Sequence, residues 1–276
     1  MDAGKYLRDH AVTEAHFCLA DIEVNGQDKK WRLRQSALAV HRSNYVYTAT
    51  KKNLEHPPKP LLSASFSGSG DQQEALHQAQ GMAAGFLRAR ELANLPPNIC
   101  TPAYLADQAR EIAGAYQKVE AEILETAEMS ELGMNALLAV GQGSENTPRL
   151  IVLRYNGADS GTKPVVFVGK GITFDTGGIS LKPAEHMDQM KYDMGGAAAV
   201  IGAFESCAEL DLPVNLVCIV AAAENMPGSR AYRPGDVITS MSGQTIEVLN
   251  TDAEGRMVLC DALTYAQRFE PTAIVD

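Results

Sequence analysis

The chain has 276 residues, which suits one large domain or two modest ones, and its apolar content of 45% is ordinary for a globular protein with a core. The net charge is −10, and the sequence contains no cluster of Lys and Arg residues. Both observations argue against nucleic acid or an anionic membrane as the main partner. No apolar run reaches transmembrane length, and five scattered cysteines without a CxxC pair predict a reducing, cytoplasmic setting.

The first 70 residues are predicted to form a partial N-terminal α/β domain. Apolar runs at residues 15–24 and 37–48 predict strands, and the Ser/Gly-rich stretch 63–70 predicts a turn before a helix. No first core strand is evident in residues 1–70. We therefore expect that the beginning of this N-terminal domain is missing from the sequence.

A connecting helix is predicted over residues 71–94, where apolar residues recur at helical spacing and Asp71 is the expected N-cap. Two consecutive prolines follow and end it. We therefore expect a connecting segment at residues 71–95 and a catalytic domain at residues 96–276.

The second domain is predicted to alternate helices with strands. It begins with a helix over 102–118, for which Thr101 is the expected N-cap and Pro102 the first residue. Later strands are predicted at residues 120–124, 136–140, 150–155, 165–168, 215–222, 246–249 and 273–275, and later helical segments at 129–132, 195–210 and 256–269. This alternation predicts an α/β fold with a mixed sheet flanked by helices. Because the last strand coincides with the end of the chain, the C-terminal part of this domain is expected to be missing.

Charged side chains are concentrated around the most apolar part of the chain. Lys170 directly follows the strand predicted at 165–168, and Asp252 follows the one at 246–249, where α/β sheets gather functional groups. Other charged residues near these two are Asp175, Lys182, Asp193, Glu254 and Arg256. So many charges beside buried strands are costly unless they share a partner, and two divalent metal ions are the simplest one.

Several of these residues also have an ordinary structural explanation. Thr251-x-x-Glu254 matches a capping box for the following helix, and Asp193 could be the N-cap of an Ala-rich helix. Lys182, next to a proline, is typical of a solvated side chain. Asp175 is harder to explain in this way, because it precedes a Thr-Gly-Gly turn that brings backbone close to whatever the turn binds.

Two further patterns favour a cation. Asp252 and Glu254 are two residues apart, so in an extended segment both point to one side and repel each other unless a cation lies between them. Lys170, flanked by glycines, is either a snorkelling surface residue or a buried amine, whose pKa would fall beside cations so that it could bind metal.

Three segments together resemble the leucyl (cytosol) aminopeptidase family, specifically its bacterial aminopeptidase A type. They are V-G-K-G-I-T-F-D-T-G-G-I-S-L-K at residues 168–182, M-K-Y-D-M-G-G at 190–196 and N-T-D-A-E-G-R at 250–256. The match also includes A-E-N-M-P-G-S-R-A-Y-R-P-G-D-V at 223–237, and it covers roughly residues 90–276. The first 70 residues carry no comparably specific motif.

The resemblance implies a two-metal exopeptidase. One metal would be held by Lys170, Asp175, Asp193 and Glu254, and the other by Asp175, Asp252 and Glu254. Manganese or zinc is expected, with magnesium or cobalt also possible, since oxygen-rich sites with one amine suit these ions.

The resemblance also assigns roles to residues that do not bind metal. Lys182 would polarise the scissile carbonyl, Arg256 would hold a bicarbonate ion as general base, and Met190 would line the pocket for the N-terminal side chain. The implied substrates are peptides with N-terminal leucine or a similar apolar residue, and the implied assembly is a cytoplasmic homo-hexamer.

Two alternatives remain open at this point. One is an inactive or scaffolding fragment of the same fold, which metal content would distinguish. The other is a dinuclear hydrolase of phosphate esters, against which the lack of a His-rich ligand set and of a P-loop argues.

Overall fold

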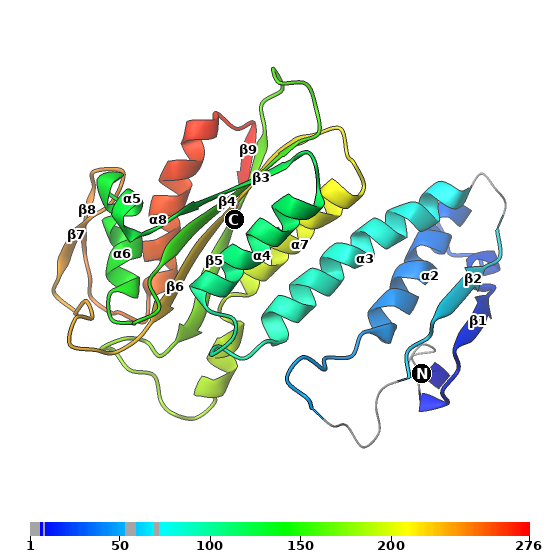
Figure 1. Cartoon of the computed structure of the whole chain (residues 1–276), viewed down its shortest axis with the longest axis horizontal. Coiled ribbons are helices and arrows are strands. Elements are labelled where there is room, and N and C mark those ends of the chain that lie inside the picture. The colour runs from blue at the N-terminus through cyan, green and yellow to red at the C-terminus, as the bar shows by residue number, and fades with distance from the viewer. Residues whose placement is uncertain (1–5, 8, 53–58, 69–71) are drawn as a thin grey trace. The chain divides into compact units, whose positions relative to one another are not determined.

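The computed structural model describes residues 6–7, 9–52, 59–68 and 72–276 (Figure 1). The chain divides into two compact units, Met1–Arg88 and Ala89–Asp276. Helix α3 (Gln73–Asn94) crosses the boundary between these units, which confirms the long helix predicted there. Its predicted N-cap, Asp71, lies outside the described residues.

The first unit combines a two-stranded parallel sheet with helices. β1 (Glu14–Phe17) pairs with β2 (Ser63–Phe66), and a short 3-10 helix (Leu19–Asp21) follows β1. The strand predicted at 15–24 is therefore wrong in extent, since β1 has only four residues. The stretch 63–70, predicted as a turn, begins with β2, and its residues 69–70 lie outside the described part of the chain. Phe17 and Phe66 lie opposite each other in this pairing, and their stacked rings, with centroids 5.3 Å apart, add a side-chain contact to it.

The strand predicted at 37–48 is wrong, because α2 (Lys29–Asn44) covers most of it. Asp28 Oδ1 caps the helix by accepting a hydrogen bond from Trp31 N at 2.7 Å. Its buried residues Leu33, Ala37 and Leu38 recur at helical spacing and face the core of this unit. Tertiary packing of that face outweighs the local strand preference of the β-branched and aromatic residues that end the segment.

The second unit is built on a five-stranded mixed sheet. The strand order is β3-β4-β6-β5-β9, in which β3, β4 and β6 are antiparallel neighbours and β6, β5 and β9 are parallel. The strands are β3 (Val119–Leu124), β4 (Arg149–Asn156), β5 (Val165–Asp175), β6 (Asn215–Asn225) and β9 (Ala273–Val275). β6 is buried along almost its whole length, as expected for a central strand covered on both faces.

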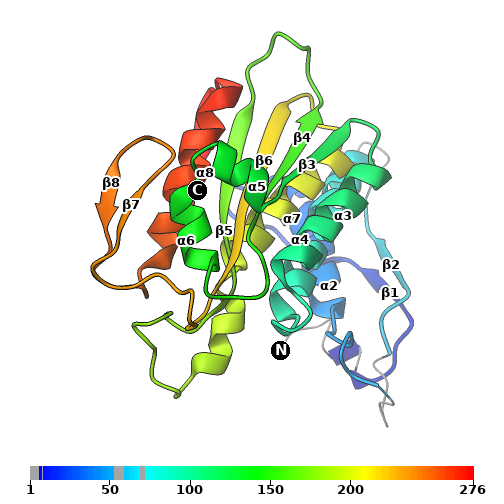
Figure 2. The same cartoon turned by 60° about the vertical axis from the view of Figure 1, so that its left-hand side comes forward.

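Helices cover both faces of this sheet (Figure 1, Figure 2). One face carries α4 (Pro102–Ala115) and α7 (Gly195–Glu209), and the other carries α6 (Asn135–Gly141) and α8 (Glu254–Ala266). The predicted mixed sheet flanked by helices is confirmed. Thr101 caps α4 as predicted, since its Oγ1 accepts from Tyr104 N at 3.3 Å.

Two predicted strands of this unit are corrected. Residues 136–140 form α6, because the buried carboxylate of Asp261 accepts hydrogen bonds from Ala136 N and Leu137 N at 2.9 and 3.0 Å and so satisfies the helix N-terminus. Of residues 246–249, only 246 and 247 lie in a strand, β8 (Thr245–Glu247), which pairs with β7 (Val237–Thr239) in a separate hairpin and not in the main sheet.

Short helical segments complete this unit. α5 (Thr126–Glu131) lies between β3 and α6, a 3-10 helix (Met187–Tyr192) precedes α7, and another (Gln267–Phe269) follows α8. Within the described part of the chain, we find no helix with the length and apolarity that a membrane span requires.

Candidate metal centre

The first segment of the site is the end of β5 and the turn after it. Asp175 is the last residue of β5 and is only 2% exposed. Its Oδ1 accepts hydrogen bonds from Gly177 N at 2.9 Å and from Asn225 Nδ2 at 2.8 Å. Gly177 and Gly178 have φ angles of 85° and 67°, and a Cβ on Gly177 would lie 2.5 Å from the Ser180 carbonyl oxygen. Glycine is therefore required where the chain turns under Asp175.

The second segment is the loop that leads into α8. Thr251 is fully buried; its Oγ1 donates to Gly177 O at 2.6 Å and accepts from Ser180 N at 2.8 Å. Thr251 is thus bound to the turn after β5 and forms no capping box with Glu254, because the N-cap of α8 is Ala253 without a side-chain cap. The ordinary explanation of Glu254 as a helix-capping residue therefore fails.

The third segment precedes α7. Asp193 is not the N-cap of that helix, which is Met194 without a side-chain cap. Instead, Asp193 Oδ1 lies 2.9 Å from Lys170 Nζ. Lys170 belongs to β5 itself rather than to the loop after it, since β5 is longer than predicted. Lys170 Nζ also lies 2.5 Å from Glu254 Oε1, and a Cβ on Gly255 would approach that Nζ to 3.0 Å.

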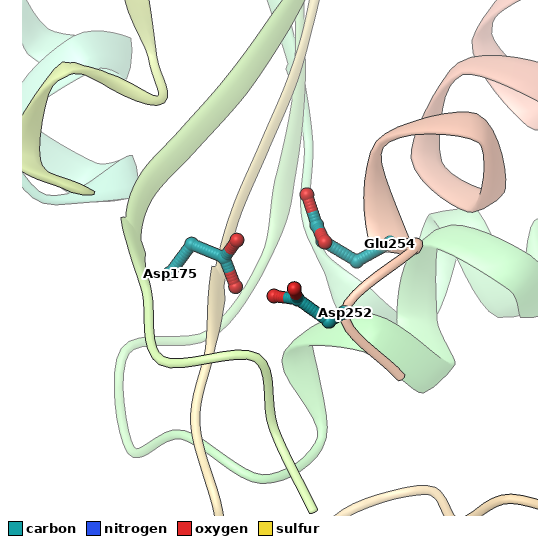
Figure 3. A group of neighbouring side chains, drawn as sticks. All are labelled: Asp175, Asp252 and Glu254. Atoms are coloured by element: carbon teal, nitrogen blue, oxygen red, sulfur yellow. The ribbon is translucent and has the colours of Figure 1, made fainter. Parts of the chain in front are cut away.

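These segments converge on one cluster (Figure 3). Asp175, Asp252 and Glu254 point their carboxylates toward one another, with one oxygen from each lying within 4.8 Å of the others. Lys182 Nζ lies 2.9 Å from Asp175 Oδ2 and also contacts Asp252 Oδ1. Lys170 and Asp193 join this cluster through the contacts of Lys170 with Asp193 and Glu254. Six of the eight predicted site residues therefore lie in one cluster.

The other two predicted residues lie on adjoining segments. Arg256 is exposed on the first turn of α8, two residues after Glu254. Met190 is half-buried in the 3-10 helix before α7, and its carbonyl oxygen accepts from Asp193 N at 3.2 Å.

Burial, together with hydrogen bonds and neighbouring charges, shifts several pKa values in the cluster. Burial raises the pKa of Asp193 to about 6, against the opposing effect of Lys170 and with a further increase from Glu254 and Asp175. Burial lowers the pKa of Lys170, but hydrogen bonds to Glu254 and Asp193 outweigh it and the pKa is raised. The pKa of Lys182 is likewise raised, because hydrogen bonds to Asp252 and Asp175 exceed the effect of burial.

The residues present fit divalent cations. Asp193 Oδ2 and Glu254 Oε2 are buried oxygens that have no hydrogen-bond partner among the described residues. A buried acceptor without a partner is unfavourable, and a bound cation would satisfy it. The four carboxylates also outnumber the two ammonium groups that they contact, so the cluster keeps a negative excess. Carboxylates with one amine are a donor set that manganese and zinc accept.

The role of three residues that support this cluster was missed in the sequence, where one of them, Thr251, was interpreted only as part of a capping box. Asn225, Tyr232 and Thr251 are buried and join its segments by hydrogen bonds. The signal available was the polar Asn225, which follows the apolar stretch 216–223 of β6, inside a segment already recognised at 223–237.

Comparison with known families decides the assignment. The family model described as "Cytosol aminopeptidase family, catalytic domain" matches residues 87–276, more than half of the chain. The chain belongs to the cytosol aminopeptidase family. The resemblance noted in the sequence is thereby confirmed.

Relatives within the cytosol aminopeptidase family match nearly the whole chain. It is 49% identical over 275 residues to the probable cytosol aminopeptidase of Idiomarina loihiensis, covering 98% of this chain and 55% of the relative. It is 50% identical over 279 residues to that of Dechloromonas aromatica, covering 99% and 56%. The chain therefore spans about half the length of the curated relatives that it matches.

Solved structures agree with this fold. The bottromycin maturation enzyme BotP in complex with Mn is 34% identical, with a TM-score of 0.86 over 97% of this chain and 56% of that protein. The cytosol aminopeptidase from Coxiella burnetii is 31% identical, with a TM-score of 0.80 over 99% of this chain and 57% of that protein.

Proposed function

We propose that this chain carries the dinuclear metal centre of an aminopeptidase that hydrolyses the N-terminal residue from peptides, with preference for leucine and similar apolar residues. The observation that carries the proposal is the convergence of Asp175, Asp252 and Glu254, with Lys170 and Asp193 beside them. The unpartnered buried oxygens of Asp193 and Glu254 support cation binding, and membership of the cytosol aminopeptidase family supports peptide hydrolysis.

We assign the ligands as follows. One ion would be bound by Lys170, Asp175, Asp193 and Glu254, and the other by Asp175, Asp252 and Glu254. Asp175 and Glu254 would serve both ions, which is supported by their nearly complete burial, at 2% exposed each, against 22% and 33% for the Asp193 and Asp252 side chains. Manganese is favoured because one solved structure of the structurally similar BotP is in complex with Mn, and zinc suits the same donors.

When bound, two such ions supply a water of lowered pKa as nucleophile and electrostatic stabilisation of the transition state. The protein supplies the remaining groups. Lys182 is 20% exposed and lies at the edge of the cluster, so its ammonium can donate a hydrogen bond to the scissile carbonyl oxygen as negative charge develops there. Lys170 must release a proton before its nitrogen can bind metal, because an ammonium has no free lone pair. Its hydrogen bonds to Glu254 and Asp193, which raise the pKa of Lys170, oppose that release.

Arg256 is proposed to bind a bicarbonate ion that accepts a proton from the attacking water. Its exposed guanidinium lies on the first turn of α8, where the helix dipole also favours an anion. Met190 is proposed to contact the N-terminal side chain of the substrate. A cytoplasmic homo-hexamer is proposed from family membership alone.

The function is tested by loading the protein with Mn²⁺ or Zn²⁺ and assaying leucyl p-nitroanilide and p-nitrophenyl phosphate in parallel. We expect two bound ions, of which one dissociates first on dialysis because its ligands are oxygens only, and hydrolysis of the anilide alone. Metal binding without any hydrolysis would indicate a scaffold, hydrolysis of the phosphate ester would indicate the other class of dinuclear hydrolase, and absence of metal binding would refute the site.

A further inference from the structure

Asn225 lies at the end of β6, between the two segments that supply Asp175 and Asp252. It is completely buried. Its Nδ2 donates hydrogen bonds to Asp175 Oδ1 at 2.8 Å and to Thr251 O at 3.0 Å. A single side-chain amide therefore joins the end of β5 to the residue that precedes Asp252.

The partners of this amide determine its orientation. Both groups that face Nδ2, a carboxylate oxygen and a carbonyl oxygen, can only accept hydrogen bonds. Turning the amide of Asn225 would place Oδ1 against both of them. In the observed orientation Oδ1 is buried and has no hydrogen-bond partner within the described part of the chain. The two donated bonds therefore outweigh one unpartnered acceptor.

This contact orients the Asp175 carboxylate. Oδ1 is engaged twice, by Asn225 Nδ2 and by Gly177 N. With Oδ1 held on that side, the other oxygen, Oδ2, faces the charged cluster and lies 2.9 Å from Lys182 Nζ. One oxygen of Asp175 is thus fixed to the fold and the other is presented to the site.

The same amide acts on the loop before α8. The Thr251 carbonyl oxygen accepts a second hydrogen bond, from Tyr232 Oη at 2.8 Å, and both Tyr232 and Thr251 are buried. Because this carbonyl belongs to the peptide group that leads into Asp252, the two bonds fix the plane of that peptide. The Asp252 side chain is 33% exposed, so the fixed peptide before it limits where its carboxylate can lie.

We propose that Asn225 is a positioning residue for the metal centre, which sets the relative placement of Asp175 and Asp252 and is assisted by Tyr232. This inference rests on the metal site of the proposed function. Asn225 does not bind the cation itself, and it acts by orienting one carboxylate and one peptide group. Partners of metal ligands in this outer position typically contribute about 10- to 100-fold in metal affinity.

Asn225→Leu tests this, because it removes both donors and keeps a buried side chain of similar size. Asn215→Leu is the matched control. Asn215 lies at the opposite end of β6, and its Nδ2 also donates to two carbonyl oxygens, those of Asp159 at 3.0 Å and Thr162 at 2.8 Å. The affinity of the whole chain for Mn²⁺ is measured by titration calorimetry, and thermal unfolding of the metal-free proteins is followed by circular dichroism.

We expect Asn225→Leu to bind Mn²⁺ about 10- to 100-fold more weakly than the wild type. Asn215→Leu should bind Mn²⁺ as tightly as the wild type, even if both variants unfold at a lower temperature. Wild-type affinity in Asn225→Leu, or an equal loss in Asn215→Leu, overturns the positioning role and leaves the proposed function intact. If the wild type itself binds no Mn²⁺, both proposals are overturned.

A second variant decides the question if Asn225→Leu does not fold. Tyr232→Phe keeps the ring in the core and removes only the hydroxyl that donates to Thr251 O. A several-fold loss of Mn²⁺ affinity in Tyr232→Phe, with unchanged secondary structure, supports the placement of Asp252 by these bonds. Unchanged affinity overturns it.

Discussion

Replacement of Lys182 by methionine separates metal binding from transition-state stabilisation. Lys182 Nζ lies 2.9 Å from Asp175 Oδ2 and contacts Asp252 Oδ1, both of which are proposed metal ligands. Its ammonium therefore competes with a cation for these two carboxylates. Methionine keeps the aliphatic stem and its packing but removes the charge.

The two expected effects have opposite signs. A charge-assisted hydrogen bond contributes about 1.5–3 kcal/mol. Two effects reduce this contribution: the Lys182 side chain is 20% exposed, and its removal also avoids the desolvation of an ammonium. We therefore expect Lys182 to oppose Mn²⁺ binding by about 1 kcal/mol, so that Lys182→Met binds Mn²⁺ about fivefold more tightly. Loss of a donor to the developing oxyanion should lower kcat by about a hundred- to a thousandfold.

The assay measures Mn²⁺ affinity by calorimetry and kcat with leucyl p-nitroanilide at saturating Mn²⁺. Lys191→Met is the control, because Lys191 is a half-buried lysine that donates to Asn94 O at 3.2 Å and lies over the ring of Tyr192. It should change neither quantity. A Lys182→Met variant that loses Mn²⁺ affinity together with kcat, or keeps a kcat like that of the control, would refute the reasoning.

Three further variants test other parts of the site and its support. Asp175→Asn and Glu254→Gln should lower kcat/KM and Mn²⁺ content more than Asp252→Asn, because the first two are proposed to serve both ions; equal effects with metal retained in all three would contradict this. Arg256→Ala should lower kcat by at most about ten-thousandfold and abolish the rate increase that added bicarbonate gives the wild type. Asp261→Ala should lower the free energy of unfolding by about 3 kcal/mol or more in urea titrations, since three backbone N–H groups lose their carboxylate acceptor.

The sequence predicted the charged members of the cluster because their signal is local. Lys170 and Asp175 lie in one strand, and Asp252 and Glu254 lie in one loop and helix start. Their spacing could be read directly, and the resemblance of these segments to one family supplied the roles. The sheet that carries Asp175 was also predictable, because long apolar runs such as β6 specify buried strands.

What the sequence could not show are contacts between distant segments. Residues 136–140 look like a strand locally, and they form a helix because Asp261, more than 120 residues later, accepts from their backbone N–H groups. The capping-box pattern of Thr251 and Glu254 is also locally sound. It is overridden because the Thr251 hydroxyl binds Gly177 and Ser180, more than 70 residues earlier.

Two partly buried lysines explain how four carboxylates can lie so close together in the folded chain. Lys170 contacts Asp193 and Glu254, and Lys182 contacts Asp175 and Asp252, so each ammonium joins two carboxylates from different segments. This pairing offsets like-charge repulsion that would otherwise raise the free energy of the folded state. The carboxylate cluster is therefore arranged by the fold together with its lysines, and a cation bound there would have to compete with these ammonium groups. Because the lysines differ in their proposed fates, with Lys170 becoming a ligand and Lys182 turning to the substrate, their replacement should affect metal affinity in opposite directions.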